Sequence, residues 1–329
     1  MVFLQVSFEW WANYGMITAI LTNLSLAAIA LDPVADQIRN CGLDCRIDLP
    51  GGTITATEPW EFDGRNVRLE SAGAWTTVQW RLPPGSVFAL STIGCERVSM
   101  ERITFALRSD SYVPQVGWLA ARAPAPEGAQ YARSVGKWTI DRVNWSFKAR
   151  KASVYLIGIE CEVMIGCGFS NNWKPSSAEP GYALYLSDGD DLDVPGDYSR
   201  DPARNTSASH VYVGCNLGQY AWTISAIHPV FPLGLGRNVH DLRWTGGSVG
   251  SNPYMTAVLH VRGAGNYNVF LDAPEWEAKN TDWCIQVDAP ISTLWWIGGL
   301  AQARKGVMRP SKAAMPNLRL EPARKMVNE

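Results

Sequence analysis

The chain has 329 residues, enough for one large domain or two ordinary ones, and 47% of them are hydrophobic, so a substantial core can form. The formal net charge of −2 gives no reason to expect a nucleic-acid partner. The 15 tryptophans have two interpretations: exposed indoles that stack on a flat ligand such as a sugar ring, or wide side chains that fill a wide core.

Residues 1–21 form an apolar lead segment. No charged residue occurs between Trp10 and Leu31, a length that could span a bilayer. Polar residues such as Asn13 and Ser25 interrupt this stretch, and no basic region precedes it, so a signal peptide fits poorly. We therefore expect an amphipathic or buried segment and no membrane partner, with a membrane or export role as the alternative.

Residues 22–45 are predicted to form a capping helix region. Thr22 or Asn23 can cap a helix that runs to about residue 40, and Pro33 should interrupt it before a second short turn. From residue 46 apolar and polar residues alternate on both sides of a Pro-Gly-Gly corner at residues 50–52. This pattern predicts a strand, a tight corner and a second strand.

The cysteines and histidines do not form a recognisable site. Seven cysteines at irregular spacing make no disulfide framework, and neither close pair comes with a second ligand pair for zinc, so most should be reduced and buried. The four histidines are scattered, and no two share helical i, i+4 spacing. We expect no metal or catalytic role for them.

One apolar and polar pattern occurs twice, as RVSMERITFALRS at residues 97–109 and as KWTIDRVNWSFKA at residues 137–149. The polar pair Glu101-Arg102 aligns with Asp141-Arg142. Two such residues make a poor hairpin turn but a good bend between successive sides of a coil. Short strands of this kind recur up to about residue 300, which predicts an all-β, single-stranded parallel β-helix. The two stretches should be the same corner of coils about two turns apart, with residues 108–136 and 188–209 as inserted loops.

A helix followed by IDLPGGTITATEPWEFDGRNVRLESAG resembles the start of the pectate-lyase-like right-handed β-helix superfamily. The matching residues are Leu49, Pro50, Gly51, Gly52, Ile54, Val67, Leu69 and Gly73. Within that superfamily the chain looks most like bacteriophage tailspikes and related polysaccharide-processing proteins, although residues 1–21 are too short for the head-binding domain that such chains often carry. The resemblance implies a right-handed β-helix over residues 46–300, a polysaccharide partner, a virion or extracellular location and a homotrimer.

The first candidate catalytic pair is Glu160 and Glu162. If residues 157–169 alternate as one strand, Ile157 to Phe169 in steps of two face inward, and both carboxylates face outward. Carboxylates at i, i+2 lie about 6.5–7 Å apart at the backbone, a spacing compatible with an inverting glycosidase. The other interpretation is that these are ordinary solvated charges on a strand.

The second candidate site is the turn YLSDGDDLDVPGD. Asp188, Asp190 and Asp191 crowd around a glycine, which suggests a calcium loop, but the EF-hand spacing with its closing glutamate is absent. A solvated acidic turn is the alternative. Calcium is the one cofactor that this sequence suggests, and the predicted function requires none.

The third candidate site is the segment LDAPEWEAKNTDWCIQVD. Glu275 and Glu277 again have i, i+2 spacing, and Asp282 accompanies Trp276 and Trp283. Carboxylates beside indoles suit a glycan cleft, because they supply hydrogen bonds to hydroxyls and a stacking surface. The Asn-Thr-Asp triplet at residues 280–282 is also found in polygalacturonases, but the other motifs of that family do not follow, so that activity is not assigned. A structural loop is the alternative.

The tail from residue 301 to residue 329 is basic and carries three prolines, which predicts an extended arm or a docking segment rather than another coil, with a disordered tail as the alternative. Taken together, the sequence predicts binding, and conditionally hydrolysis, of a cell-surface polysaccharide. The catalytic residues would be Glu160 and Glu162 or Glu275 and Glu277, and the binding residues would be Trp173, Trp276, Trp283 and Asp282. A non-catalytic structural or adhesion component is the alternative, and a polysaccharide lyase is the third hypothesis.

Overall fold

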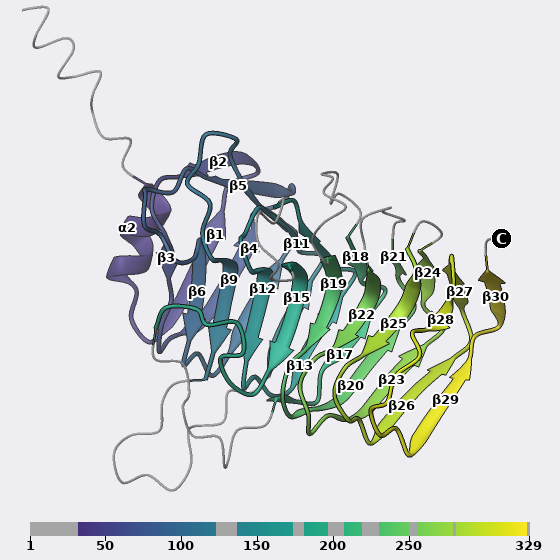
Figure 1. Cartoon of the computed structure of the whole chain (residues 1–329). Helices are drawn as coiled ribbons and strands as arrows, with labels where there is room; N and C mark the ends of the chain where they lie inside the picture. Colours follow the sequence, from purple (N-terminus) through teal and green to yellow (C-terminus); the bar gives the residue numbers. More distant parts are fainter. Residues whose placement is uncertain are drawn as a thin grey trace, which may run out of the picture.

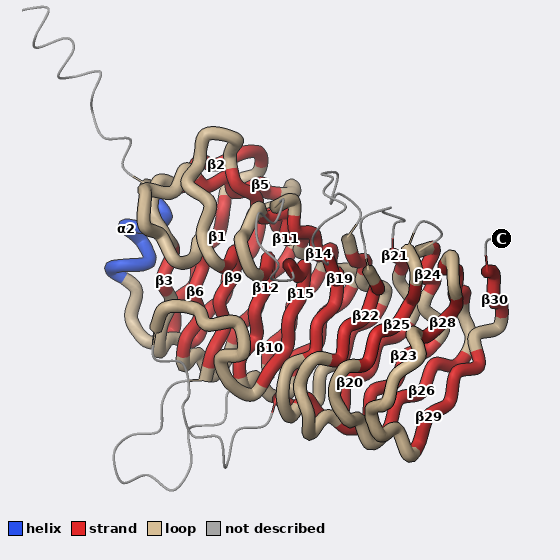
Figure 2. The backbone as a smooth tube through the Cα atoms, viewed as in Figure 1, coloured by secondary structure: helices blue, strands red, loops and turns tan. Residues whose placement is uncertain are grey.

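The structure is a computed structural model that describes residues 32–122, 137–173, 181–196, 207–218, 230–249, 256–278 and 281–327. It is a single-stranded, right-handed parallel β-helix with a short helix over its N-terminal end, as predicted (Figure 1). The coils stack side by side along one axis, and each coil contributes one strand to each of three parallel sheets (Figure 2). The lead segment 1–21 lies outside the described residues.

The sheets are named here A, B and C in the order in which the chain visits them. Sheet A contains β1 (Asp44–Leu49), β4 (Asn66–Ser71), β7 (Val98–Glu101), β10 (Trp138–Asp141), β13 (Glu162–Ile165), β17 (Val211–Val213), β20 (Val239–Thr245), β23 (Tyr267–Asp272), β26 (Thr293–Ile297) and β29 (Asn317–Glu321), with β16 (Ser207–Ala208) paired to β20. Sheet B contains β2 (Gly52–Ala56), β5 (Thr76–Trp80), β8 (Ile103–Leu107), β11 (Asn144–Phe147), β14 (Gly168–Asn171), β18 (Asn216–Leu217), β21 (Ser248–Val249), β24 (Glu275–Glu277), β27 (Leu300–Ala303) and β30 (Arg324–Val327). Sheet C contains β3 (Trp60–Glu61), β6 (Leu90–Ile93), β9 (Val116–Ala121), β12 (Ala152–Ile157), β15 (Gly181–Ser187), β19 (Val230–Leu235), β22 (Ala257–Val261), β25 (Trp283–Val287) and β28 (Gly306–Met308).

The described part of the predicted capping helix region contains one helix, which begins at the proline where the sequence suggested a break. Residues 22–31 lie outside the described residues. Helix α2 spans Pro33–Asn40, with Asp32 as its N-cap and Pro33 in the first turn. A proline is favourable there, because the first helical N–H groups have no partner within the helix. The Asp32 carboxylate accepts hydrogen bonds from the backbone of Val34 and Ala35 and from the Trp60 indole at 2.9 Å. This aspartate therefore joins the helix to the first coil.

The corner between sheets A and B is a single residue with left-handed backbone geometry. Arg102 has φ 56° and Arg142 has φ 52°, and glycines 166 and 214 take the same place in later coils. The corner amides remain in the ladder, since the Arg102 N–H bonds to the Asp141 carbonyl at 3.1 Å. The repeated Glu-Arg and Asp-Arg pairs are therefore this corner, as predicted. They belong to adjacent coils rather than to coils two turns apart, because Met100 pairs directly with Ile140.

Inward side chains at equivalent positions of successive coils stack into ladders that fill the interior of the β-helix. On sheet B the inward ladder is Val78, Phe105, Trp145, Phe169, Leu217, Val249, Trp276 and Ala301. The Trp145 and Phe169 rings stack with centroids 5.0 Å apart. Eight of the 15 tryptophans have less than 2% of their surface exposed, so most indoles serve the wide core. Such a core is stabilised by the removal of apolar surface from water.

Two further predictions are corrected. The basic tail is not an arm over its described part: β28, β29 and β30 pair with β25, β26 and β27 and complete another coil, up to residue 327. Cys41 and Cys45 form a disulfide beside the capping helix, although no disulfide was expected. Cys95, Cys167, Cys215 and Cys284 are free and buried, as predicted for most of the cysteines, whereas Cys161 is exposed.

Candidate functional site

The outer face of sheet B carries short, uncharged polar side chains in its middle coils. Side chains alternate along each strand, so the residues next to the buried ladder point outward. One outer row contains Thr77, Thr104, Asn144, Gly168 and Asn216, and these positions pair in register from strand to strand. A second row contains Gln79, Ala106, Ser146 and Ser170.

A surface pocket of about 280 Å³ lies on this face. Its lining residues are Thr104, Asn144, Trp145, Ser146, Gly168, Phe169, Ser170 and Asn216. Because Trp145 and Phe169 are almost fully buried, the side chains presented to a ligand are hydroxyls and amides. Gly168 keeps the floor open, since a Cβ there would lie 2.5 Å from Asn144 Oδ1. The pocket can therefore donate and accept hydrogen bonds without charge.

Aromatic and amide groups border the pocket. The indole of Trp75 is 41% exposed and donates to Thr104 Oγ1 at 2.8 Å. At the other end of the strands, Asn172 donates to Ser146 Oγ at 3.3 Å, while its buried Oδ1 has no protein partner within the described residues. Trp173 follows, half-buried, with the Lys148 ammonium 5.9 Å from its ring centroid. These groups supply a stacking surface and an unused acceptor.

Two carboxylates lie on the same face, further along the stack. Glu275 and Glu277 are both exposed on β24, and Trp276 between them is fully buried. Glu275 pairs in register with Ser248, whose hydroxyl donates to Asn216 Oδ1 at 2.9 Å, so the outer row continues from the pocket to this glutamate. The prediction that the two glutamates lie on one face of the strand, with the indole between them on the other, is correct. Trp276 cannot be a stacking surface, because its ring packs inside the coil against Trp296 at 4.7 Å.

The prediction that Glu160 and Glu162 share an outer face is wrong. Residues 157–169 run from the end of β12 through β13 to the start of β14, with two corners between them, rather than forming one strand. At the first corner, Cys161 takes a left-handed φ of 59°. This residue resets the alternation, so Cys161 and Ile165 are exposed and Glu162 points into the coil. Glu160 remains partly exposed at the corner and forms an ion pair with the buried Arg122. The two carboxylates therefore cannot act on one bond.

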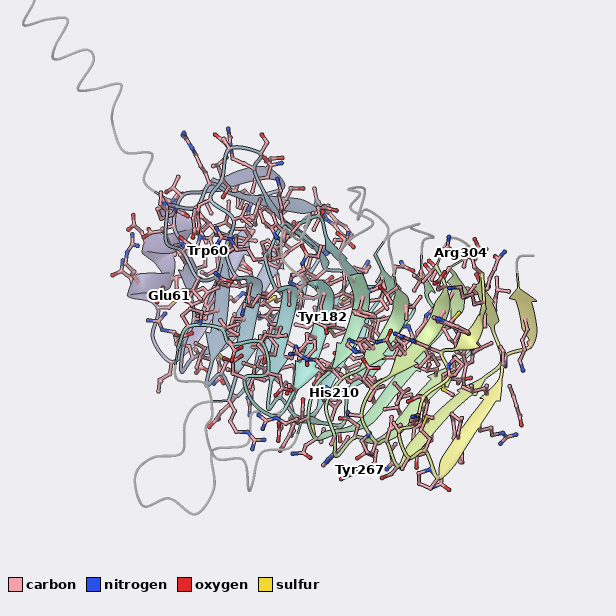
Figure 3. The ribbon with its side chains drawn as sticks, viewed as in Figure 1. Trp60, Glu61, Tyr182, His210, Tyr267 and Arg304 are labelled. Carbon is pink, nitrogen blue, oxygen red and sulfur yellow. A yellow bond between two sulfur atoms is a disulfide. The ribbon has the colours of Figure 1, made fainter. Side chains whose placement is uncertain are left out.

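Glu162 belongs to an interior polar cluster, defined here as Glu162, Ser207, His210 and Tyr212. All four are fully buried. Figure 3 labels His210 among the strands of the coil. Glu162 Oε1 accepts from the Tyr212 hydroxyl at 2.9 Å and bonds to His210 Nδ1, while His210 Nε2 lies 3.0 Å from Ser207 Oγ. Burial raises the pKa of Tyr212 well above its ordinary value. With no exposed member, the cluster joins neighbouring coils rather than meeting a ligand.

The acidic turn after β15 uses its carboxylates for local hydrogen bonds. Asp190 accepts from the backbone N–H groups of Leu192 and Val194, and Asp191 accepts from Arg237 Nε at 2.7 Å. Asp188 accepts from Asn238 at 2.5 Å, and burial raises its pKa and that of Asp190. Among the described residues, no three His, Cys, Asp or Glu side chains are placed to hold a metal ion. A calcium role for this turn stays a prediction.

Asp282 and Trp283 lie at a corner of sheet C, away from the pocket. The Asp282 carboxylate pairs with Lys305 and Arg304, each at 2.7 Å, and these hydrogen bonds, that of Lys305 first, lower its pKa. Trp283 is half-buried and packs beside the apolar outer cluster of sheet C. Neither residue shares a surface with Glu275 and Glu277 in any contact that the structure describes.

Sequence reasoning missed a polar chain on the outer side of sheet C. The Tyr182 hydroxyl lies 3.0 Å from His260 Nδ1, and His260 Nε2 lies 2.8 Å from the Asp288 carboxylate. Burial lowers the pKa of His260. Tyr182, which Figure 3 labels, is fully buried. These hydrogen bonds therefore connect β15, β22 and the residue after β25, and they present no nucleophile to solvent.

The sequence did contain a signal for the pocket. In VNWSF and GFSN the polar residues alternate with aromatic ones that proved to be core, but only the register between coils shows that they are neighbours. No protein-family model matches this chain, and neither a curated protein nor a solved structure matches it. The described residues include no helix that is long and apolar enough to cross a bilayer.

Proposed function

We propose that this chain binds a cell-surface polysaccharide along the outer face of sheet B. The observation that carries the proposal is the uncharged pocket over β8, β11, β14 and β18, with its hydroxyl and amide lining. Sugars present several hydroxyls around an amphipathic ring, and such a ring needs dispersed hydrogen bonds together with an aromatic surface. Trp75 and Trp173 supply that surface at the pocket's border.

Cleavage is the second step of the proposal, and Glu275 with Glu277 would carry it. Their backbone spacing of about 6.5–7 Å suits an inverting mechanism, in which one carboxylic acid protonates the glycosidic oxygen and the other carboxylate activates a water molecule. Glu275 stands three strands from Gly168 on the outer row, roughly 14 Å at strand spacing. A glycan of several sugar rings would reach from the pocket to these carboxylates.

A resemblance to the pectate-lyase-like superfamily at the entry strand supports the same proposal, as does the β-helix itself. A tailspike-like protein with a virion or extracellular location would use the coil to hold such a face in an extended form. The alternative is a non-catalytic structural component, in which the regular stack of coils is a stiff spacer.

The binding test measures retention of the chain on a panel of immobilised bacterial capsular polysaccharides and lipopolysaccharides. Ser146→Trp should fill the pocket and abolish retention of the best ligand. Ser292→Trp makes the same change at an exposed corner between sheets C and A, and retention should not change. No retention on the panel, or equal retention by both variants, contradicts the proposal.

The cleavage test measures new reducing ends after incubation with the retained polysaccharide. Glu275→Gln or Glu277→Gln should remove the activity and leave retention intact, whereas Glu96→Gln, at an exposed corner, should change neither. Retention without release would favour the structural alternative, and a product that absorbs in the ultraviolet would indicate a lyase.

A further inference from the structure

The outer face of sheet A separates its charges by sign into two parallel rows. One position of each strand forms the cationic row: Arg46, Arg68, Ser99, Thr139, Val163, Val211, Arg243, Phe270, Trp295 and Arg319. The position two residues later forms the anionic row: Asp48, Glu70, Glu101, Asp141, Ile165, Val213, Thr245, Asp272, Ile297 and Glu321. Every charged residue of the first row is an arginine, and every charged residue of the second is an acid.

Apolar side chains occupy the middle and the far part of the same two rows. Ile165 is 43% exposed, Val213 is 40% exposed and Ile297 is 38% exposed. They make up three of the seven large apolar residues that are exposed within the described part of the chain. Trp295 is two residues before Ile297 on β26, and its ring centroid lies 5.4 Å from that of Phe270. These apolar residues form two groups, one on β13 and β17 and one on β23 and β26, which Arg243 and Thr245 of β20 separate, and they are together called the apolar strip. Exposed apolar surface of this kind marks a surface that another molecule covers.

We propose that sheet A is the interface of a homodimer in which two β-helices lie side by side with their axes parallel. A two-fold axis between the rows, along the direction of stacking, places the cationic row of one copy over the anionic row of the other. Arg68 then faces the partner's Glu70, and Arg319 faces the partner's Glu321. The same rotation places Val163 over the partner's Ile165 and Trp295 over the partner's Ile297.

An antiparallel dimer does not place opposite charges over each other in this way. If the axis instead runs along the strands through β20, the two copies are antiparallel and each row covers itself. Asp141 on β10 then faces the partner's Glu321 on β29, and like charges placed opposite each other cost binding energy. The parallel arrangement is therefore the one that the charge pattern selects. The arginines already pair within one copy, as Arg68 does with Glu70 at 2.6 Å, so the charges fix register more than affinity.

The face is large enough for a stable contact. Ten strands at about 4.8 Å spacing extend roughly 43 Å, and a width of about 15 Å gives on the order of 650 Å² of covered sheet per copy, near the standard interface size. The apolar strip supplies the affinity, because it removes exposed isoleucine, valine and indole surface from water. This interface leaves the outer face of sheet B open, so it is independent of glycan binding.

The test measures the molar mass of the full chain by light scattering and the dimer dissociation constant by sedimentation. Val163→Glu combined with Ile165→Glu should raise that constant by at least about 100-fold, since it places four carboxylates in the apolar strip. The matched control is Thr53→Glu with Thr55→Glu, two exposed positions at the same spacing on sheet B, and it should leave the constant unchanged. Circular dichroism shows whether both variants remain folded.

Exchanging the charges of one arginine and one acid gives a second test of the interface, measured by the same dimer dissociation constant. Arg68→Glu or Glu70→Arg alone should weaken the dimer about tenfold, and the two together should restore it, because the partner's row changes as well. A monomer at micromolar concentration, a trimer, or an equal effect of the sheet A and sheet B variants would overturn the proposal.

Discussion

The two glutamate pairs have the same spacing in the sequence but different environments in the fold. Glu275 and Glu277 lie within one strand, so both are exposed and the residue between them is buried. Glu160 and Glu162 lie on either side of Cys161, whose left-handed backbone turns the chain from one sheet toward the next. One carboxylate stays at the surface and the other enters the core. Alternation therefore predicts a face only where no corner residue intervenes.

The largest effect should come from the buried residue between the exposed pair. Trp276→Ala should lower the free energy of unfolding by about 3–5 kcal/mol, because a fully buried indole leaves a cavity. Urea unfolding followed by circular dichroism measures it. The matched change Trp75→Ala, at an exposed indole, should cost far less stability and should weaken glycan binding instead. Equal losses of stability would show that the two indoles were assigned to the wrong environments.

The second effect distinguishes the inner carboxylate from the outer ones. Glu162→Gln should lower the free energy of unfolding by about 1–3 kcal/mol, because the interior polar cluster loses a charged acceptor for His210 and Tyr212. Glu277→Gln should leave the same urea midpoint unchanged. An unfolding curve of Glu162→Gln identical to that of the unmodified chain would mean that Glu162 is not inside the coil.

The corner residue should show a smaller effect of the opposite sign. Cys161→Gly should raise the free energy of unfolding by up to about 1 kcal/mol, because glycine adopts a positive φ without the steric cost that a Cβ adds. Thermal unfolding under reducing conditions measures the change. A loss of stability of similar size would argue that residue 161 does not have this backbone conformation.

The smallest effect concerns pH and the polar chain of sheet C. Burial lowers the pKa of His260 in the folded protein below its unfolded value near 6.5. The unfolded chain therefore binds the extra proton first, so stability is complete above that pH and decreases as the pH falls below it. His260→Gln should reduce the slope of stability between pH 7 and pH 5 in urea titrations. The pKa of His240 is also lowered by burial, so His240 should still contribute to that slope in the variant. An unchanged slope would contradict the assignment.

The fold could be predicted because it depends on a local rule that the sequence repeats. Strands such as VSME and WTID alternate apolar and polar residues, and the arginine corners recur between them. The candidate site could not be predicted as a whole, because Thr104, Asn144 and Asn216 meet only through the register between coils. Loops of different length separate these strands, and nothing in the sequence says where each coil closes. Pro33 stands where the sequence suggested a break, because a proline is unfavourable in a helix interior but suits the first turn of α2.

Oxidative footprinting of the indoles, with and without a retained oligosaccharide, tests the central claim most directly. The claim is that the glycan lies on the outer face of sheet B. Trp75 and Trp173 should be protected by the bound glycan, and Trp283, partly exposed at sheet C, should be oxidised as before. Protection of Trp283 with continued oxidation of Trp75 and Trp173 would contradict the claim.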